Sequence, residues 1–176
     1  YVTIGYPIMI IGAGQDKTTI HGGFKIEGTK EEKKRVDMQG MTMKGSSGRG
    51  LYAHNSLSFL CKDMTFTQCR YSGVYACNAK GRLINCVITQ CRRSGIDCSS
   101  NALIELEGDQ TKVDGNGTSG AIGDEYGLRT SSTIHLLFPL TKESVSTNNQ
   151  GGNYGSYHGG TIQTVTTFAE TEATNA

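Results

Sequence analysis

At 176 residues with a formal net charge of +1, the chain is the size of one domain and has no overall charge that would attract nucleic acid. No apolar run reaches the roughly 20 residues of a membrane-spanning helix, so we expect a soluble protein with neither a membrane nor a nucleic-acid partner. Glycine is abundant (24 residues), proline is scarce (2) and tryptophan is absent. This composition favours an all-β chain with many tight turns.

The N-terminal segment starts inside what reads as a β-strand, Tyr1-Val2-Thr3-Ile4. It has none of the features of a signal peptide. Because a strand is interrupted, we expect that residues have been removed upstream, which keeps an extracellular or virion-surface location open. The next segment, 28–36, is charged and has no apolar face, so we predict a solvated loop there.

A repeat of roughly 22 residues follows, marked by a glycine and then an apolar residue. The markers are Gly23-Phe24, Gly50-Leu51, Gly73-Val74, Gly95-Ile96 and Gly127-Leu128. Successive markers lie 27, 23, 22 and 32 residues apart, so the middle intervals are bare repeats and the outer two contain insertions. A fixed period of this length is typical of a solenoid.

The repeats at 51–73 and 74–95 align along most of their length and place apolar residues at alternate positions. Extending the register gives four columns: Phe24, Leu51, Val74, Ile96 and Leu128; Ile26, Ala53, Ala76, Cys98 and Thr130; Met41, Met64 and Cys86; and Met43, Phe66 and Ile88. Runs this short need the rungs above and below to pair their backbone groups. We therefore predict an all-β domain over 1–168, a single-stranded parallel β-helix of about six rungs, with a polar tail at 169–176.

Two later segments, 115–126 and 141–160, depart from the bare repeat and are rich in glycine and polar residues. We predict loops there, and a last strand over 161–168. Loops on one flank of a rigid stack are where binding sites tend to lie. The alternative is loop drift without function.

Six cysteines raise the question of disulfides. Cys69 and Cys91 lie 22 residues apart, each in the context Thr-Gln-Cys-Arg, so they are expected to stack on successive rungs. That spacing would permit a disulfide, but we favour reduced, buried thiols, because cysteine packs well as a small apolar residue. The absence of a paired C-x-x-C spacing argues against a zinc site.

The unit Leu83-Ile84-Asn85-Cys86-Val87-Ile88, followed by Ser94-Gly95-Ile96-Asp97-Cys98, resembles the rung consensus of the pectin lyase-like superfamily. The stretch 10–20 is similar to the first rung of its pectin methylesterase-type members, and the resemblance covers roughly residues 8–136. It implies a right-handed β-helix. It implies no single activity, because the superfamily includes lyases, hydrolases, esterases, epimerases, phage tailspikes and non-catalytic recognition modules.

No complete catalytic motif of these enzymes occurs, and Tyr157-His158-Gly159-Gly160 is the nearest match to the Gly-His-Gly of polygalacturonases. The remaining catalytic candidates are the carboxylates Glu105, Glu107 and Asp124. Alternation predicts that Glu105 and Glu107 face outward about 7 Å apart, a range that suits acid and base for glycoside cleavage or a Ca²⁺ site. The alternative is a solvated strand face. No other cofactor is expected.

One further pair combines a histidine with a thiol, since His54 is expected to lie beside Cys77 on the next rung. Such a pair could be nucleophilic or could bind a metal. We favour a chance pairing at a rung corner, because no third group that would orient the histidine is identifiable.

The outward face of the two bare repeats combines aromatic and cationic residues. Tyr52 is expected to stack on Tyr75, Arg70 on Arg92 and Tyr71 on Arg93, with Lys80 and Arg82 nearby. Aromatic rings pack on sugar C–H faces and arginine binds carboxylate or sulfate groups in bidentate fashion. The face therefore suits an acidic polysaccharide, with cross-strand tyrosine pairing and solubilising charge as the alternative.

Three hypotheses for function follow. The first is a non-catalytic structural or recognition module that binds acidic polysaccharide or a protein partner, with Tyr52, Tyr75, Arg70, Arg92 and Arg93 as its contact residues. The second is a polysaccharide lyase, hydrolase or epimerase. The third is an oligomeric subunit of a surface or virion assembly.

Overall fold

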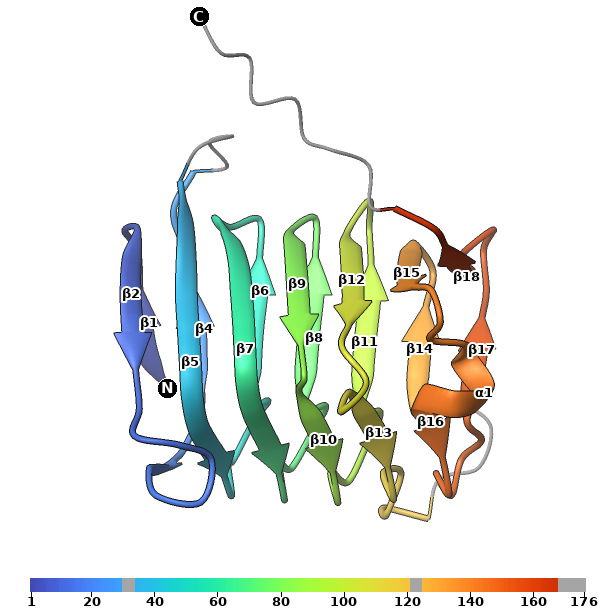
Figure 1. Ribbon diagram of the computed structural model, residues 1–176, viewed down its shortest axis with the longest axis horizontal. Coiled ribbons are helices and arrows are strands. Elements are labelled where there is room, and N and C mark those ends of the chain that lie inside the picture. The colour runs from blue at the N-terminus through green and yellow to red at the C-terminus, as the bar shows by residue number, and fades with distance from the viewer. Residues whose placement is uncertain (30–33, 121–124, 168–176) are drawn as a thin grey trace, which may run out of the picture.

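The chain coils into a parallel β-solenoid of about six turns, with 50% of its residues in strands (Figure 1). The computed structural model describes residues 1–29, 34–120 and 125–167. Strands from successive turns pair in parallel. Each short strand of an inner turn thus obtains its backbone hydrogen bonds from the turns before and after it, as the solenoid prediction required.

One face of the solenoid is a seven-stranded sheet to which successive turns contribute one short strand each. In stacking order its members are β1 (Val2–Ile4), β4 (Phe24–Ile26), β6 (Leu51–His54), β8 (Val74–Cys77), β11 (Ile96–Ser99), β14 (Leu128–Thr130) and β17 (Tyr154–Ser156).

The remaining strands form an 11-stranded sheet. They are β2 (Ile8–Ile11), β3 (Thr19–His21), β5 (Arg35–Lys44), β7 (Ser58–Thr67), β9 (Lys80–Ile84), β10 (Val87–Thr89), β12 (Leu103–Glu107), β13 (Lys112–Asp114), β15 (Thr133–Leu137), β16 (Ser146–Thr147) and β18 (Thr161–Val165). The long strand β7 pairs with β9 through its first half and with β10 through its second. Asp63, between the halves, has a positive φ of 49°. It marks the corner at which this sheet passes from one side of the coil to the next.

The predicted columns of apolar residues are confirmed on both sheets. Leu51 pairs with Phe24 on one side and with Val74 on the other, and Val74 pairs in turn with Ile96. Phe66 lies between Met43 and Ile88 in the same way, on the other sheet. One repeat of the sequence is therefore one turn of the coil.

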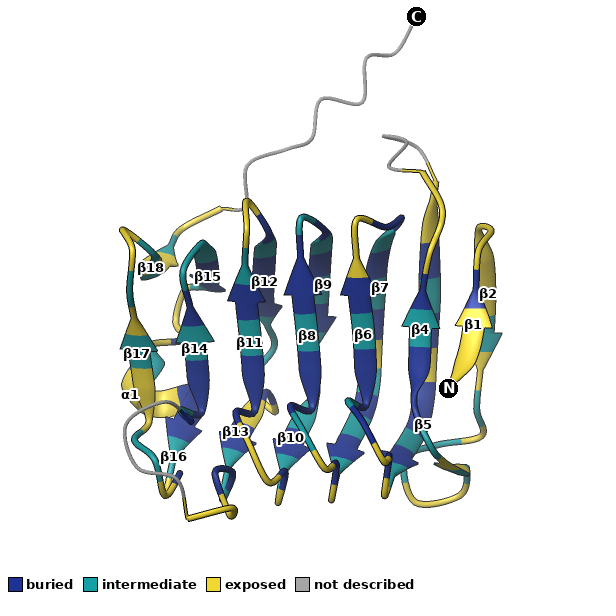
Figure 2. Cartoon of the chain, turned by 180° about the vertical axis from the view of Figure 1, so that it is seen from behind, coloured by how far each residue is buried: buried dark blue, intermediate teal, exposed yellow. Residues whose placement is uncertain are grey.

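These columns fill a continuous interior, in which the central strands alternate between buried and partly exposed residues (Figure 2). Leu51, Val74 and Ile96 are fully buried, as are Phe66 and Ile88. All six cysteines are buried with free thiols, which confirms the predicted burial. Cysteine thus serves here as a small apolar residue that fits a narrow core.

Two of the predicted loops differ from the structure. Residues 30–33 of the first lie outside the described residues, and its end at Arg35 and Val36 already belongs to β5. The segment 141–160 contains the one-turn helix α1 (Lys142–Val145), β16 and β17. Helix α1 begins because Thr141 and Ser144 form a reciprocal capping box, and Val145 is then buried.

The remaining predictions concern the loop at 115–126 and the C-terminal end of the chain. Residues 115–120 form turns without a strand, as predicted, and residues 121–124 lie outside the described residues. The predicted last strand is β18, which is shorter than predicted. The proposed tail at 169–176 lies outside the described residues as well.

Within the part of the chain that the structure describes, no helix is long and apolar enough to cross a membrane.

Candidate functional site

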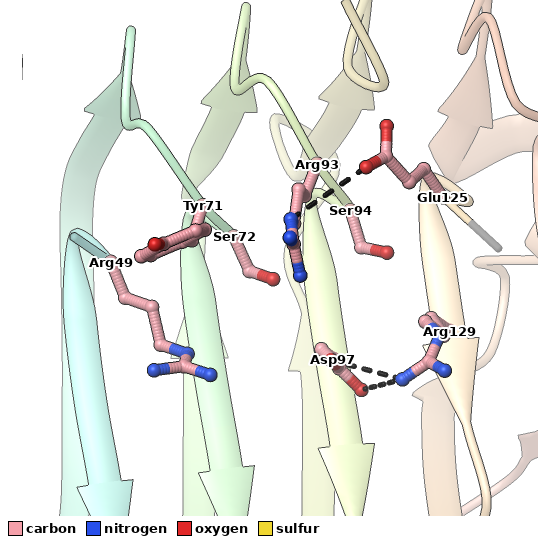
Figure 3. A pocket seen from close by; sticks show the side chains of 8 residues that line it. All are labelled: Arg49, Tyr71, Ser72, Arg93, Ser94, Asp97, Glu125 and Arg129. Carbon is pink, nitrogen blue, oxygen red and sulfur yellow. Dashed lines mark hydrogen bonds and ion pairs between the residues drawn. The ribbon is translucent and has the colours of Figure 1, made fainter. Parts of the chain in front are cut away.

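A depression of about 320 Å³ lies on the outer side of the seven-stranded sheet, beside the corner that leads into β6, β8, β11 and β14 (Figure 3). We call it the arginine pocket. It is lined by Arg49, Tyr71, Ser72, Arg93, Ser94, Asp97, Glu125 and Arg129.

The stacking of small residues at one corner position explains the depression. The residues directly before the marker glycines are Arg49, Ser72, Ser94 and Tyr126, and backbone hydrogen bonds link these corners from turn to turn. Ser72 and Ser94 are buried, at 4% and 2% exposure. Two turns with small residues at this position, between turns with large ones, leave a trough with a serine floor.

The strand side of the arginine pocket is formed by a partly buried ion pair. Asp97 on β11 and Arg129 on β14 are partners in the sheet register, and Nη1 of Arg129 lies 3.2 Å from both carboxylate oxygens of Asp97. The side chain of Asp97 is only 14% exposed. Burial raises the pKa of the Asp97 carboxyl above its ordinary value. The charge and hydrogen bond of Arg129 oppose that rise, as do the more weakly acting charges of Arg49 and Arg93.

The corner side of the arginine pocket holds a second ion pair. Nε of Arg93 lies 3.7 Å from Oε1 of Glu125, whose side chain is 8% exposed. The guanidinium of Arg93 also lies 4.9 Å from the ring centroid of Tyr71. Ser119 donates a hydrogen bond to the other oxygen of Glu125. Both carboxylates of the pocket are therefore held by cations of the pocket itself.

An aromatic cluster borders the arginine pocket on its N-terminal side. The rings of Tyr52 and Tyr75, register partners on β6 and β8, lie 5.5 Å apart. The guanidinium of Arg49 lies 4.8 Å from the Tyr52 ring and 4.1 Å from the Tyr75 ring. Contacts at these distances are cation–π interactions, which hold the guanidinium of Arg49 over the two rings.

Arg49 differs from the other two arginines in its partners. No carboxylate lies within ion-pair distance of Arg49 in the described ranges 1–29, 34–120 and 125–167. Its Nε atom is buried and has no hydrogen-bond acceptor. Figure 3 shows the Arg49 side chain directed toward the pocket, and neither of the two ion pairs marked by dashed lines involves Arg49. Arg49 is therefore a guanidinium with donor capacity to spare.

The structure brings together three of the five residues predicted to bind ligand. The predicted stack of Tyr52 on Tyr75 is confirmed, and Arg93 lines the adjoining pocket. Arg70 is exposed, with its guanidinium 6.0 Å from the ring of Tyr71. Arg92 is exposed and does not line the pocket.

Sequence reasoning missed the roles of Arg49, Arg129 and the carboxylate Asp97 in this site. The available signal was the register itself, which places Tyr75, Asp97 and Arg129 in one outward row. The expectation that Arg82 lies near the tyrosines is wrong, because β9 belongs to the 11-stranded sheet.

The three predicted catalytic carboxylates are not part of the arginine pocket. Glu105 faces away from the core, but its side chain is only 3% exposed and its Oε2 accepts hydrogen bonds from Arg82 at 2.9 Å. The alternative of a solvated strand face is therefore wrong for Glu105. Glu107 is half-buried at the end of β12, and Asp124 lies outside the described residues.

The structure also bears on the predicted metal site and on the predicted pair of His54 and Cys77. No group of three His, Cys, Asp or Glu side chains that could hold a metal ion occurs among the residues described. His54 and Cys77 are register partners, as predicted. His54 is within hydrogen-bond distance of the Asn55 amide, at 3.4 Å, and Cys77 is buried.

Comparisons with protein-family models, with curated proteins and with solved structures give no match to this chain.

Proposed function

We propose that this protein is a non-catalytic recognition module that binds acidic polysaccharide in the arginine pocket and on the adjoining tyrosine rings. The observation that carries the proposal is Arg49, a cation without a carboxylate partner among the described residues, held between the tyrosine cluster and a serine-floored trough. Tyrosine rings suit the C–H faces of sugars, and a guanidinium suits a carboxylate or sulfate group.

The rigidity of the site supports recognition of an extended polymer. Tyr52, Tyr75, Asp97 and Arg129 lie on consecutive strands of one sheet, so their spacing is set by the backbone ladder and not by loop conformation. A row of this kind presents successive contacts along a chain of sugars. Such preorganisation lowers the entropy lost on binding.

Titration calorimetry with polygalacturonate, alginate and a neutral glucan tests the proposal. We expect binding of an acidic polymer and none of the glucan, with affinity falling as salt is raised. Tyr75→Ala should weaken binding about tenfold, whereas Arg35→Met, on the other sheet, should not change it. Release of shorter products from either acidic polymer would contradict the non-catalytic assignment.

A polysaccharide-active enzyme is the second candidate, because Asp97 and Glu125 line the same pocket and burial raises the pKa of Asp97. A carboxyl with a raised pKa is suited to act as a general acid. On this hypothesis Asp97→Asn would abolish turnover. Turnover unaffected by Asp97→Asn would remove Asp97 from a catalytic role.

We also propose that the chain is a member of the pectin lyase-like superfamily, whose coils are right-handed. Support comes from the parallel solenoid of about six turns and from the similarity of residues 83–88 and 94–98 to the rung consensus. An experimental electron-density map tests this directly. A left-handed coil in that map would reject the proposal.

A further inference from the structure

The charges of the arginine pocket suggest which anionic ligands it accepts. Its lining holds three arginines and two carboxylates, Asp97 and Glu125, which leaves a net charge of +1. Both carboxylates are largely buried and each lies within 4 Å of an arginine of the pocket. Buried carboxylates keep their partners, because an unpaired charge in such a place is costly.

Two of the three arginines therefore have a carboxylate partner before any ligand arrives. Arg129 is held by Asp97 and Arg93 by Glu125. The remaining cation is Arg49, whose guanidinium lies over the rings of Tyr52 and Tyr75. A guanidinium with unused donors can bind one planar anion in bidentate geometry, and Nε of Arg49 has no hydrogen-bond partner.

The same carboxylates disfavour a second anion. A second sulfate or carboxylate in the pocket would lie among the lining residues that include Asp97 and Glu125. Once Arg49 holds one anion, the lining and its ligand together carry no net charge. A second anion then meets no unpaired cation and would have to take Arg129 from Asp97 or Arg93 from Glu125. The hydroxyl groups of a sugar, by contrast, can donate hydrogen bonds to these carboxylates.

We propose that Arg49 binds the single anionic group of a sugar unit and that Asp97 and Glu125 act as a charge filter against densely sulfated glycans. This inference rests on the proposed function and refines it. Asp97 and Glu125 determine specificity, because they occupy Arg129 and Arg93 and leave one cation for an anionic group.

Calorimetric titration of the full chain with two probes tests the filter. One probe is an aldobiouronic acid, a disaccharide with one carboxylate, and the other is a trisulfated heparin disaccharide. The aldobiouronic acid should bind about tenfold more tightly. Arg49→Met should lose about tenfold in affinity for it, whereas the matched variant Arg35→Met, an exposed arginine paired with Asp37, should retain it.

The isosteric variant Asp97→Asn separates the filter from the anion contact. It should raise the affinity for the trisulfated probe about tenfold and leave the affinity for the aldobiouronic acid within about threefold. Glu125→Gln provides a second, independent removal of charge with the same expected direction. Circular dichroism of each variant establishes that it is folded.

The outcomes of this experiment are distinguishable. Wild-type protein that binds the trisulfated probe as tightly as the aldobiouronic acid overturns the filter, while the proposed function stands. Unchanged affinity of Arg49→Met overturns the assignment of Arg49. Binding of neither probe overturns the inference and the proposed function together.

Discussion

At the scale of the residue, Gly81 shows how closely the interior is packed. It lies on β9 directly next to Phe59 in the register, and a Cβ atom built at position 81 would lie 2.1 Å from Cζ of the Phe59 ring. Phe59 is buried at 2% exposure, so its ring is enclosed by the core. Glycine is therefore required here because a neighbouring ring occupies the space of a side chain.

We expect Gly81→Ala to lower the free energy of unfolding by about 1–3 kcal/mol, the usual range for overpacking. Urea denaturation followed by circular dichroism measures it. Gly5→Ala is the control, because a Cβ there meets no atom within 4 Å. Adding Phe59→Leu to Gly81→Ala should restore part of the loss, and a double variant less stable than Gly81→Ala would show that the ring is not the cause.

The buried thiols give a prediction about pH. Burial raises the pKa of Cys86 to about 12 and that of Cys98 to about 11. A thiol of the unfolded chain has a pKa of about 8.5. Between these values the unfolded chain binds fewer protons than the folded one, so the free energy of unfolding falls as pH rises from about 8.5 toward 11. Urea titrations at neutral and alkaline pH measure it.

The same thiols should resist modification, because the thiolate is the reactive form. We expect slow labelling of the native protein by a thiol reagent at mildly alkaline pH and complete labelling in urea. Fast stoichiometric labelling of Cys86 or Cys98 in the native protein would contradict their burial.

At the scale of the element, one corner of the coil depends on buried amides. The corner that holds Cys91 in one turn holds Asn116 and then Asn149 in the next two. Oδ1 of Asn116 accepts a hydrogen bond from the Cys91 N–H at 3.1 Å, and Oδ1 of Asn149 accepts one from the Asn116 N–H at 2.9 Å. Nδ2 of Asn149 donates to the carbonyl of Val113 at 3.0 Å. The side chains thus substitute for the ladder where the backbone turns.

We expect Asn149→Ala to lower the free energy of unfolding by about 3 kcal/mol, because it leaves several buried polar groups without partners. Gln150→Ala, an exposed neighbour, should change it by less than about 0.5 kcal/mol. Urea unfolding of the two variants provides the comparison. Equal stability of the two variants would mean that water replaces the Asn149 amide.

The repeat predicted the strands of the central turns because the side chains of each turn meet the same position of the next. Leu51, Val74 and Ile96 could be placed by counting alone. The same columns pair Asp97 with Arg129, but they do not place the rest of the arginine pocket. Arg49 lies at a corner, where the alternation of faces no longer holds, and Glu125 lies within the insertion of a 32-residue interval. The burial of Glu105 depends on its ion pair with Arg82 from the turn before it. The periodicity of the sequence places these two residues side by side only once the register of their strands is known.

At the scale of the whole molecule, stability is distributed along the coil. Strand β8 pairs with β6 and β11, whereas β1 pairs with β4 alone among the described strands. Figure 2 shows the same gradient, with exposed residues on β1 and β2 and buried ones on the central strands. Val2 and Ile11 are 56% and 64% exposed, while Val74 is fully buried. A solenoid held by nearest-neighbour contacts is weakest where a turn has one neighbour.

Amide hydrogen exchange of the chain should therefore follow position along the coil. Amides of β8 and β11 can exchange only when their turn separates from both neighbouring turns. Amides of β1 can exchange when that strand separates from a single neighbouring strand. We expect peptides from β8 and β11 to exchange at least about tenfold more slowly than peptides from β1 and β2. Gly81→Ala should accelerate the central peptides by more than the terminal ones, because its damage is local to β7 and β9. Uniform protection along the chain would mean that the coil opens as one cooperative unit, and nearest-neighbour stacking would then be an insufficient description of its stability.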